Sequence, residues 1–247
     1  LPQKVKEGID RRQLSVITLL KESSKTLIQE EEMKKMVFER LNTGGVTLED
    51  QEIRNALYNG PFNDLCILLS SNNTFRKLWF INPDDIDGLE DELDNYDDAL
   101  KYAKNKLYKR MYDVELVLRY FAMRHIDEYS GKLSEFMDLC LRQGNRYTDN
   151  QIEILKNIFE KTIEKADILF SEKAFCQYVK RRGTFTWTSP QKMIYDSMML
   201  ALSQIEINNN KIDLNSNIER LKKFYQENED VFDGKRQSKG DIKRRME

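Results

Sequence analysis

The chain has 247 residues, 40% of them hydrophobic, and a formal net charge of -2. This length and composition predict an ordinary folded core, in one large domain or two small ones. No apolar run approaches the roughly 18 residues that a membrane helix needs, and no signal-peptide pattern is present. We therefore expect a soluble, cytoplasmic protein with no membrane partner.

The first structural signal is a strand. Leu14–Leu20 ("LSVITLL") is rich in branched apolar residues with partial alternation, which predicts a strand buried on at least one face. A lone strand leaves its backbone groups unpaired. The chain also begins with Leu1 rather than Met and enters patterned sequence at once. We therefore expect a piece of a longer polypeptide, with the rest of the sheet upstream. No other stretch of the sequence predicts a strand persuasively.

Helical spacing dominates from Glu30 onward. Apolar residues recur at intervals of three and four from Met33 to Leu41, and again from Ile53 to Leu57. Gly60-Pro61 and Asn82-Pro83 are expected to break helices. Helix is predicted, with interruptions, to the end of the chain.

Two later helices are predicted with specific starts. One runs from about Ala99 to Ile126, and the other begins at Ser189-Pro190, with serine as the cap and proline as the first helical residue. The predicted fold class is mostly α with a small α/β portion. Residues 1–82 are expected to be the end of an α/β domain, and residues 83–247 a helical domain.

Charge is uneven along the chain. The segment 84–98 ("DDIDGLEDELDNYDD") is strongly acidic, but an EF-hand is excluded because position one would be Pro83 and position twelve Asp94 instead of glutamate. A solvated acidic loop is expected. The segment 234–247 has six basic residues against two acidic ones and no aromatic residue, which predicts a solvated or frayed terminus.

The cysteines and the histidine limit the possible chemistry. Cys66, Cys140 and Cys176 are far apart in apolar helical stretches, which predicts buried free thiols instead of a disulfide or a metal site. The single histidine, His125, excludes zinc sites and histidine-dependent triads, which need more partners. It is expected to be an ordinary, partly buried histidine, and no metal site is expected in this chain.

The stretch 38–62 ("FERLNTGGVTLEDQEIRNALYNGPF") is the richest candidate site. Its structural interpretation is a corner between two helices, in which Asn42 with Gly44 or Gly45 ends the first helix. Residues 47–50 then form a variant of a capping box, and Asp50 is spaced to pair with Arg54.

The functional interpretation of the same stretch is an anion site. Two glycines before a helix expose backbone N–H groups, and Arg40 and Asn42 add side-chain donors. The acidic residues at the start of the second helix oppose this interpretation, because they would repel a phosphate unless a metal or further arginines intervened. On these residues alone the structural interpretation is the stronger one.

The stretch resembles the signature of the GmrSD-type restriction endonuclease N-terminal domain family, which has a ParB/sulfiredoxin-like core. Similarity extends to "LPQKVKEGIDRRQLSVITL", "ELVLRYFAMR" and "FDGKRQSKGDIKRRME", and the acidic segment fits least well. The resemblance thus implies the C-terminal part of such a domain, with the helical domain following. The residues that match the signature are Phe38, Arg40, Asn42, Gly44, Gly45, Gln51, Glu52, Arg54 and Asn55.

The family is associated with bacterial defence against foreign, often modified, DNA. Its D-G-Q-Q-R motif, linked to nucleotide hydrolysis or nuclease function, is absent from this chain, and we do not transfer that role to Asp10 or Arg12. The family's C-terminal histidine-asparagine-histidine nuclease domain is absent too. No catalytic residue is therefore assigned, and the chain by itself is expected to be inactive.

The resemblance implies a nucleotide half-site at Arg40, Asn42, Gly44 and Gly45, supported by the other matching residues. A nucleoside triphosphate with Mg²⁺ is expected in the full-length protein only. The implied partners are the upstream part of the same polypeptide, DNA and a second copy of the chain. The alternative function is a non-enzymatic helical module that binds another protein or acts as a scaffold.

Overall fold

The structure is a computed structural model that describes residues 6–8, 11, 26–41, 47–82, 102, 104–129, 132–207, 212–232 and 239–245. The chain divides into two compact units, Leu1–Thr47 and Leu48–Glu247. The boundary expected from the sequence was at Asn82 instead. Residues 48–82 group with the later helices because α4 and α5 pack on α8 and α10.

The first unit contains helix α2 (Leu27–Leu41). Its position confirms the helix predicted from the apolar spacing of Met33 to Leu41. The strand expected at Leu14–Leu20 and the acidic segment 84–98 lie outside the described residues, so both remain predictions, as does the ParB-like core.

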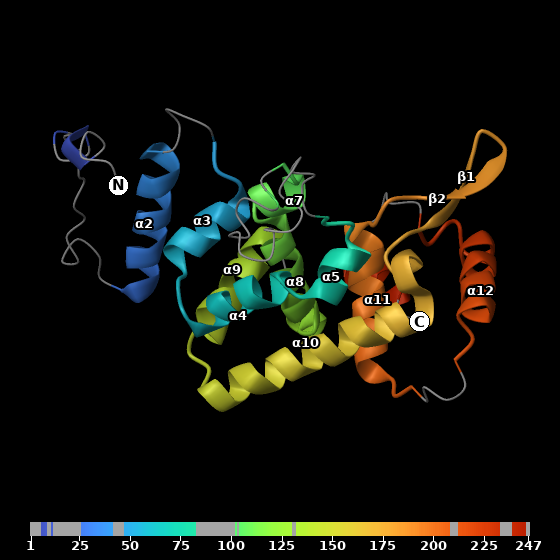
Figure 1. Cartoon of the computed structure of the whole chain (residues 1–247). Helices are drawn as coiled ribbons and strands as arrows, with labels where there is room; N and C mark the ends of the chain where they lie inside the picture. The colour runs from blue at the N-terminus through green and yellow to red at the C-terminus, as the bar shows by residue number, and fades with distance from the viewer. Residues whose placement is uncertain are drawn as a thin grey trace. The chain divides into compact units, whose positions relative to one another are not determined.

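The second unit is mostly helical with one small antiparallel sheet (Figure 1). Among the described helices, none has both the length and the apolar character that crossing a membrane requires. In chain order the elements are α3 (Asp50–Leu57), α4 (Pro61–Ser70), α5 (Asn73–Leu78), α7 (Lys106–Lys109), α8 (Tyr112–Met123), η4 (Ile126–Glu128), α9 (Leu133–Gly144), α10 (Asp149–Phe170), η5 (Ser171–Lys173), β1 (Tyr178–Arg181), β2 (Thr184–Trp187), α11 (Lys192–Gln204), α12 (Leu214–Glu227) and α13 (Lys239–Arg244).

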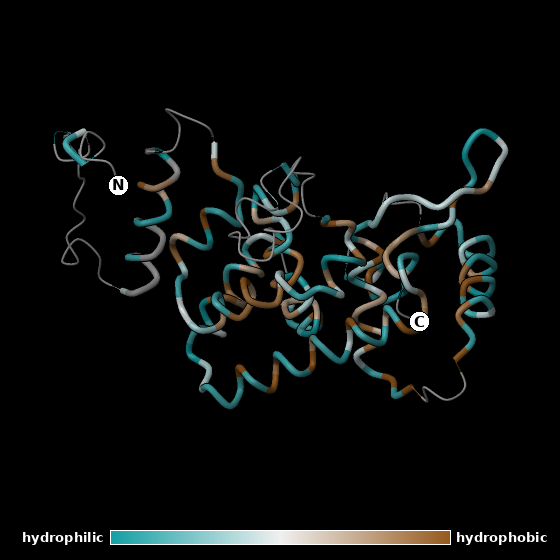
Figure 2. Tube along the Cα trace, viewed as in Figure 1, coloured by the Kyte–Doolittle hydropathy of each residue, from teal (hydrophilic) through white to brown (hydrophobic). Residues whose placement is uncertain are grey.

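Helix α8 lies at the centre of this unit. It is apolar around most of its circumference, which is typical of a helix enclosed on all sides. It packs against α3, α4, α7, α9 and α11, and hydrophobic stretches gather in the middle of the unit (Figure 2). Its fully buried side chains are Leu116, Val117, Leu118, Tyr120, Ala122 and Met123.

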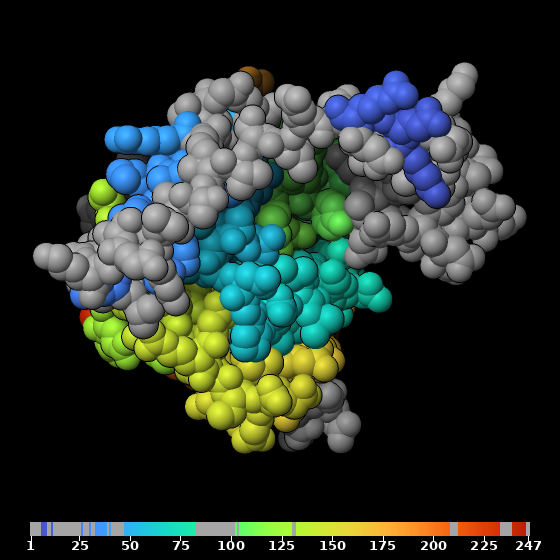
Figure 3. Space-filling view, turned by 90° about the vertical axis from the view of Figure 1, so that its left-hand side faces the viewer, coloured from blue at the N-terminus to red at the C-terminus, as the bar shows by residue number. Residues whose placement is uncertain are grey.

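Helix α10 closes one side of the core. Its buried residues Phe159, Thr162, Ile163 and Ala166 recur at three and four positions, so they form one face. The helix packs against α4, α5 and α11, and the space-filling view shows α4 and α5 directly against α10 (Figure 3).

A cluster of aromatic rings joins segments that are distant in sequence. Phe175 and Tyr195 meet edge to face with centroids 4.9 Å apart, and Trp79 lies 5.3 Å from Tyr195. Phe75 contacts Phe159 of α10 at 5.9 Å. These contacts link α5, α10 and α11. Aromatic pairs of this kind add to the stability gained from burial.

The sheet is a hairpin in a region where the sequence pattern predicted helix. β1 and β2 pair antiparallel through a two-residue turn, Arg182-Gly183, with φ angles of 50° and 87°. Positive φ at both positions is the pattern of a type I′ turn, which suits the twist of a hairpin. The prediction of helix through this region is therefore wrong. The overlooked signal was the alternation in "TFTW" after a glycine turn.

Two helix predictions also differ from the structure. The described part of the helix expected from Ala99 to Ile126 is two helices, α7 and α8, separated at Met111, whose φ of 55° is left-handed and interrupts the helical path. Helix α11 begins at Lys192 instead of Pro190, because Gln191 is extended and donates its N–H to the Phe175 carbonyl at 2.9 Å.

The described part of the basic C-terminal segment is ordered, contrary to the expected frayed terminus. Helix α13 packs against α11, and its Ile242 is buried. Arg245 donates through Nε to the Val231 carbonyl at 3.1 Å. The apolar side chain of Ile242, which lies between charged residues in the sequence, thus packs this segment against the core.

Candidate functional site

The structure describes only part of the predicted nucleotide half-site. Phe38 and Arg40 lie on α2 in the first unit, where Phe38 is half-buried and Arg40 is exposed in the last turn. Asn42, Gly44 and Gly45 lie outside the described residues. The supporting residues Gln51, Glu52, Arg54 and Asn55 all lie on α3 in the second unit.

The start of α3 is capped differently from the prediction. The N-cap is Glu49 rather than Thr47, and its N–H donates to the Glu52 carboxylate at 2.7 Å. Arg110, which precedes α8, lies 3.2 Å from Glu52 and 3.6 Å from Glu49. The acidic residues at this helix start are therefore paired with an arginine that the sequence pattern did not single out.

Arg54 is the centre of the site. Its side chain is 3% exposed, and its Nε lies 2.7 Å from Oδ1 of Asp138 on α9. Its Nη2 donates to the Ser134 hydroxyl at 2.6 Å, and its Nη1 lies 3.5 Å from Glu115 on α8. The predicted pair with Asp50 is confirmed at 3.7 Å, but it is the longest of these contacts.

The neighbouring motif residues also have structural positions. Gln51 is fully buried beside Arg54, and its Nε2 has no hydrogen-bond partner among the described residues. The side-chain Oδ1 of Asn55 accepts from the side-chain Nδ2 of Asn63 at 2.7 Å. The second half of the motif thus attaches α3 to α4, α8 and α9.

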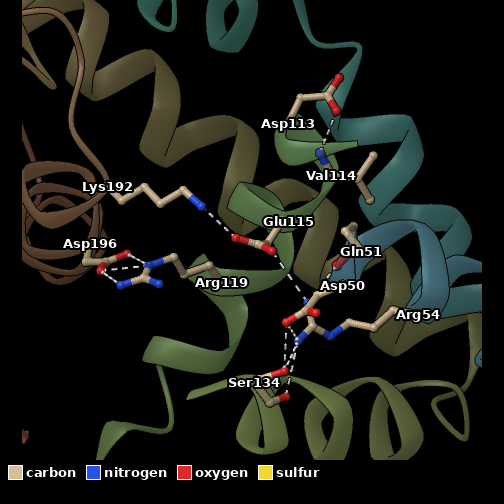
Figure 4. A network of polar contacts seen from close by, with 10 residues as sticks. All are labelled: Asp50, Gln51, Arg54, Asp113, Val114, Glu115, Arg119, Ser134, Lys192 and Asp196. Atoms are coloured by element: carbon tan, nitrogen blue, oxygen red, sulfur yellow. Dashed lines mark hydrogen bonds and ion pairs between the residues drawn. The ribbon is translucent and has the colours of Figure 1, made fainter. Parts of the chain in front are cut away.

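The network continues across α8 to α11 (Figure 4). Glu115 accepts from Lys192 at 2.7 Å on the side opposite Arg54. One turn later, Arg119 donates to both carboxylate oxygens of Asp196, at 2.5 to 2.8 Å. Burial raises the pKa of Asp196, and the Arg119 guanidinium opposes that rise.

A cavity of about 140 Å³ lies beside the Arg119–Asp196 pair. Lys192 and Arg245 also line it, so three cations and one carboxylate surround the space. Each cation has a partner: Arg119 binds Asp196, Lys192 binds Glu115, and Arg245 binds a backbone carbonyl. Because the charges described around it are matched inside the protein, the cavity is not a strong candidate for an anion site.

The other titratable groups do not assemble a reactive centre in the described ranges. Burial raises the pKa of the Cys66 thiol, that of Cys140 to about 12 and that of Cys176 to about 11, which keeps the thiols protonated at neutral pH. His125 is exposed, contrary to expectation. Where residues are described, no group of three or more His, Cys, Asp or Glu side chains is arranged to hold a metal.

The partners of Arg54 outside α3 were not predicted from the sequence. Glu115 interrupts the apolar run of α8, and Asp138 lies in the apolar middle of α9. A charge inside an otherwise apolar helical face is a signal that it needs a buried partner. That signal was present for both residues, although it does not indicate which partner each would find.

Comparison of the chain with models of protein families, with curated protein sequences and with solved structures finds no match.

Proposed function

We propose that the chain contributes half of a nucleotide-binding site to a bacterial defence protein of the GmrSD type, and that its helical unit is the scaffold for that half. Arg40 and Asn42 supply side-chain donors to a phosphate. Gly44 and Gly45 supply backbone N–H groups. The sequence resemblance is the source of this proposal.

The observation that supports it best is the anchoring of Arg54. Arg54 is buried against α8 and α9, so it attaches α3 to two helices of the core. In this arrangement Gln51, Glu52 and Arg54 have structural roles on α3, and none of them is needed to bind a ligand. In this proposal the residues that contact the ligand are therefore those before α3.

The charge balance at the start of α3 also favours the proposal. Glu49 and Glu52 are paired with Arg110, and Asp50 is paired with Arg54. Paired carboxylates repel a nearby phosphate less than free ones do. The electrostatic objection raised by the acidic sequence is therefore weaker in the folded unit.

The test uses the full-length protein with Arg40→Ala. This change is expected to weaken nucleotide binding at least tenfold and to abolish nucleotide-dependent phage restriction. The melting temperature should stay nearly unchanged, because truncating an exposed side chain typically costs under about 1 kcal/mol.

The matched control is Lys34→Ala, which removes another exposed cation from α2. It should leave binding, restriction and melting unchanged. A folded Arg40→Ala protein with normal nucleotide binding and restriction would refute the half-site. That result would favour the alternative, a helical scaffold or protein-binding module.

A further inference from the structure

A groove of about 320 Å³ lies beside β1 in the second unit. Its lining includes residues 177–181 in succession, together with Thr188, Gln191, Glu229 and Phe232. Successive residues of a strand point to opposite faces, so a space lined by the whole of β1 lies along its edge instead of on one face. β2 pairs with the other edge. The groove therefore follows the outer edge of this two-stranded sheet.

The main-chain groups at this edge are available for pairing. Thr188 donates its N–H to the Gln177 carbonyl at 2.9 Å, so these two residues form a hydrogen-bonded pair across the hairpin. In an antiparallel ladder such pairs alternate with pairs whose main-chain groups point outward. The N–H and C=O groups of Tyr178 and Lys180 therefore point away from β2. Within the described ranges, none of these four groups has a hydrogen-bond partner.

The end of the groove near the turn is basic. Lys180 and Arg181 are both exposed there, and Glu229 is the acidic residue among those that line the groove. The Lys180 ammonium lies 5.9 Å from the centre of the Phe185 ring. In the part of the chain that the structure describes, neither cation forms an ion pair. Two cations thus face one carboxylate.

The opposite end of the groove is apolar. Phe232 is buried, and its carbonyl accepts from the Gln177 side chain at 2.9 Å, which places it beside the start of β1. Tyr178 and Val179 are half-buried at the same end. Along the edge, the groove therefore changes from apolar at the start of β1 to basic near the turn.

We propose that this edge binds an extended peptide of another protein as a third strand, antiparallel to β1, and that the peptide carries two successive acidic residues followed by two apolar ones. In this direction the acidic residues lie opposite Arg181 and Lys180. The apolar residues lie opposite Val179 and Tyr178. Main-chain hydrogen bonds to the strand edge supply affinity, and the cross-strand side-chain pairs supply specificity.

Other occupants match this edge less well. Lys180 and Arg181 point to opposite faces of the strand, so one phosphate is not positioned to contact both. Two carboxylates on successive residues of an extended peptide point to opposite faces in the same way. A second copy of β1 would bring two further cations to the edge, which like-charge repulsion disfavours. The groove lies within the second unit, and the proposal does not depend on the nucleotide half-site.

The experiment measures fluorescence anisotropy of a labelled peptide, Thr-Glu-Glu-Val-Ile-Thr with blocked ends, with the 247-residue chain. Two N-methylated forms of the peptide test the main-chain bonds. Methyl groups on the second glutamate and on isoleucine replace the N–H groups that face β1, so they should abolish binding. Methyl groups on the first glutamate and on valine replace N–H groups that point away, so binding should persist.

Variants of the chain test the charges. Lys180→Gln with Arg181→Gln is expected to weaken binding about fivefold to tenfold, since two opposite-charge pairs are lost. Glu229→Gln removes a like charge from the groove and should tighten binding about twofold. The control, Arg146→Gln with Lys161→Gln, removes the same charge as the first variant from two exposed positions elsewhere in the unit. It should leave the affinity unchanged, and all variants should melt like the parent chain.

The parent chain is expected to bind the glutamine counterpart, Thr-Gln-Gln-Val-Ile-Thr, about fivefold to tenfold more weakly than the acidic peptide. No binding of the acidic peptide would overturn the proposal, and this is also the result expected if a second copy of the chain fills the edge. Equal effects of the two methylation patterns would show that the peptide does not pair with β1. Equal losses in the control and in the Lys180→Gln, Arg181→Gln variant, or weaker binding by Glu229→Gln, would refute the role of the groove charges.

Discussion

Arg54 and Asp138 form a buried ion pair between α3 and α9, with Nε 2.7 Å from Oδ1 and side chains that are 3% and 7% exposed. They are 84 positions apart in the sequence. Glu115 approaches the same guanidinium to 3.5 Å. One arginine therefore balances carboxylates from two other helices, and its loss would remove the guanidinium that lies 2.7 Å from the buried Asp138 carboxylate.

Arg54→Ala is expected to lower the free energy of unfolding by about 3 to 5 kcal/mol, because removing one partner of a buried ion pair takes away the attraction that offsets the desolvation of the other. Urea unfolding followed by circular dichroism measures this loss. Adding Asp138→Asn should restore part of it, since one buried charge is then removed. The exposed control Arg146→Ala should stay within about 0.5 kcal/mol of the parent. Equal stability of Arg54→Ala and the control would show that the network contributes little.

Asp113 should make stability depend on pH. Burial raises its pKa from 3.8 to about 7, partly opposed by the N–H of Val114 and by Arg76. The folded state therefore binds the proton more tightly than the unfolded state does. Its contribution to stability is fully present below about pH 4 and is lost as pH rises through 7.

The measurement is the melting temperature of the parent chain and of Asp113→Asn from pH 4.5 to 8.5. Relative to the parent, the variant should become more stable as pH rises, because asparagine stays neutral at every pH while retaining an oxygen for the Val114 N–H. Asp64→Asn, which changes an exposed aspartate in the first turn of α4, is the matched control. A pH-independent difference between Asp113→Asn and the parent would contradict the assignment.

Gly144→Ala should destabilise the protein although alanine is the better helix former. A Cβ on Gly144 would lie 2.3 Å from the ring of Phe62, which is 1% exposed in the core. Overpacking of this kind typically costs about 1 to 3 kcal/mol. Gly8→Ala meets no atom within 4 Å and is the control.

Chemical denaturation of Gly144→Ala, Phe62→Leu and the double variant tests the cause. If the ring contact is responsible, the double variant should be more stable than the sum of the two single losses predicts. A stabilised Gly144→Ala protein would show that α4 and α9 can move apart at little cost.

Local features were predictable from the sequence. The apolar spacing from Met33 to Leu41 predicted α2, and that from Ile53 to Leu57 predicted α3. Gly60-Pro61 separated α3 from α4 as expected. The spacing of Asp50 and Arg54 predicted their ion pair. Each of these depends on residues within one or two helical turns, so the nearby sequence contains the whole cause.

Features that depend on distant contacts were not predictable in the same way. Lys192 begins α11 because its neighbour Gln191 is extended and bonded to Phe175. Ile242 holds the basic C-terminal segment on α11, although six basic residues around it predicted a solvated end.

The sequence by itself determined the helical character of the chain and the presence of α2 and α3. It also identified Arg54 as a motif residue that is spaced to pair with Asp50. Only the tertiary structure decided what Arg54 does, because its strongest partners, Asp138 and Ser134, come from α9. A buried guanidinium needs carboxylates and hydrogen-bond acceptors around it. Sequence shows that need, but the packing of α3 against α8 and α9 determines which residues meet it.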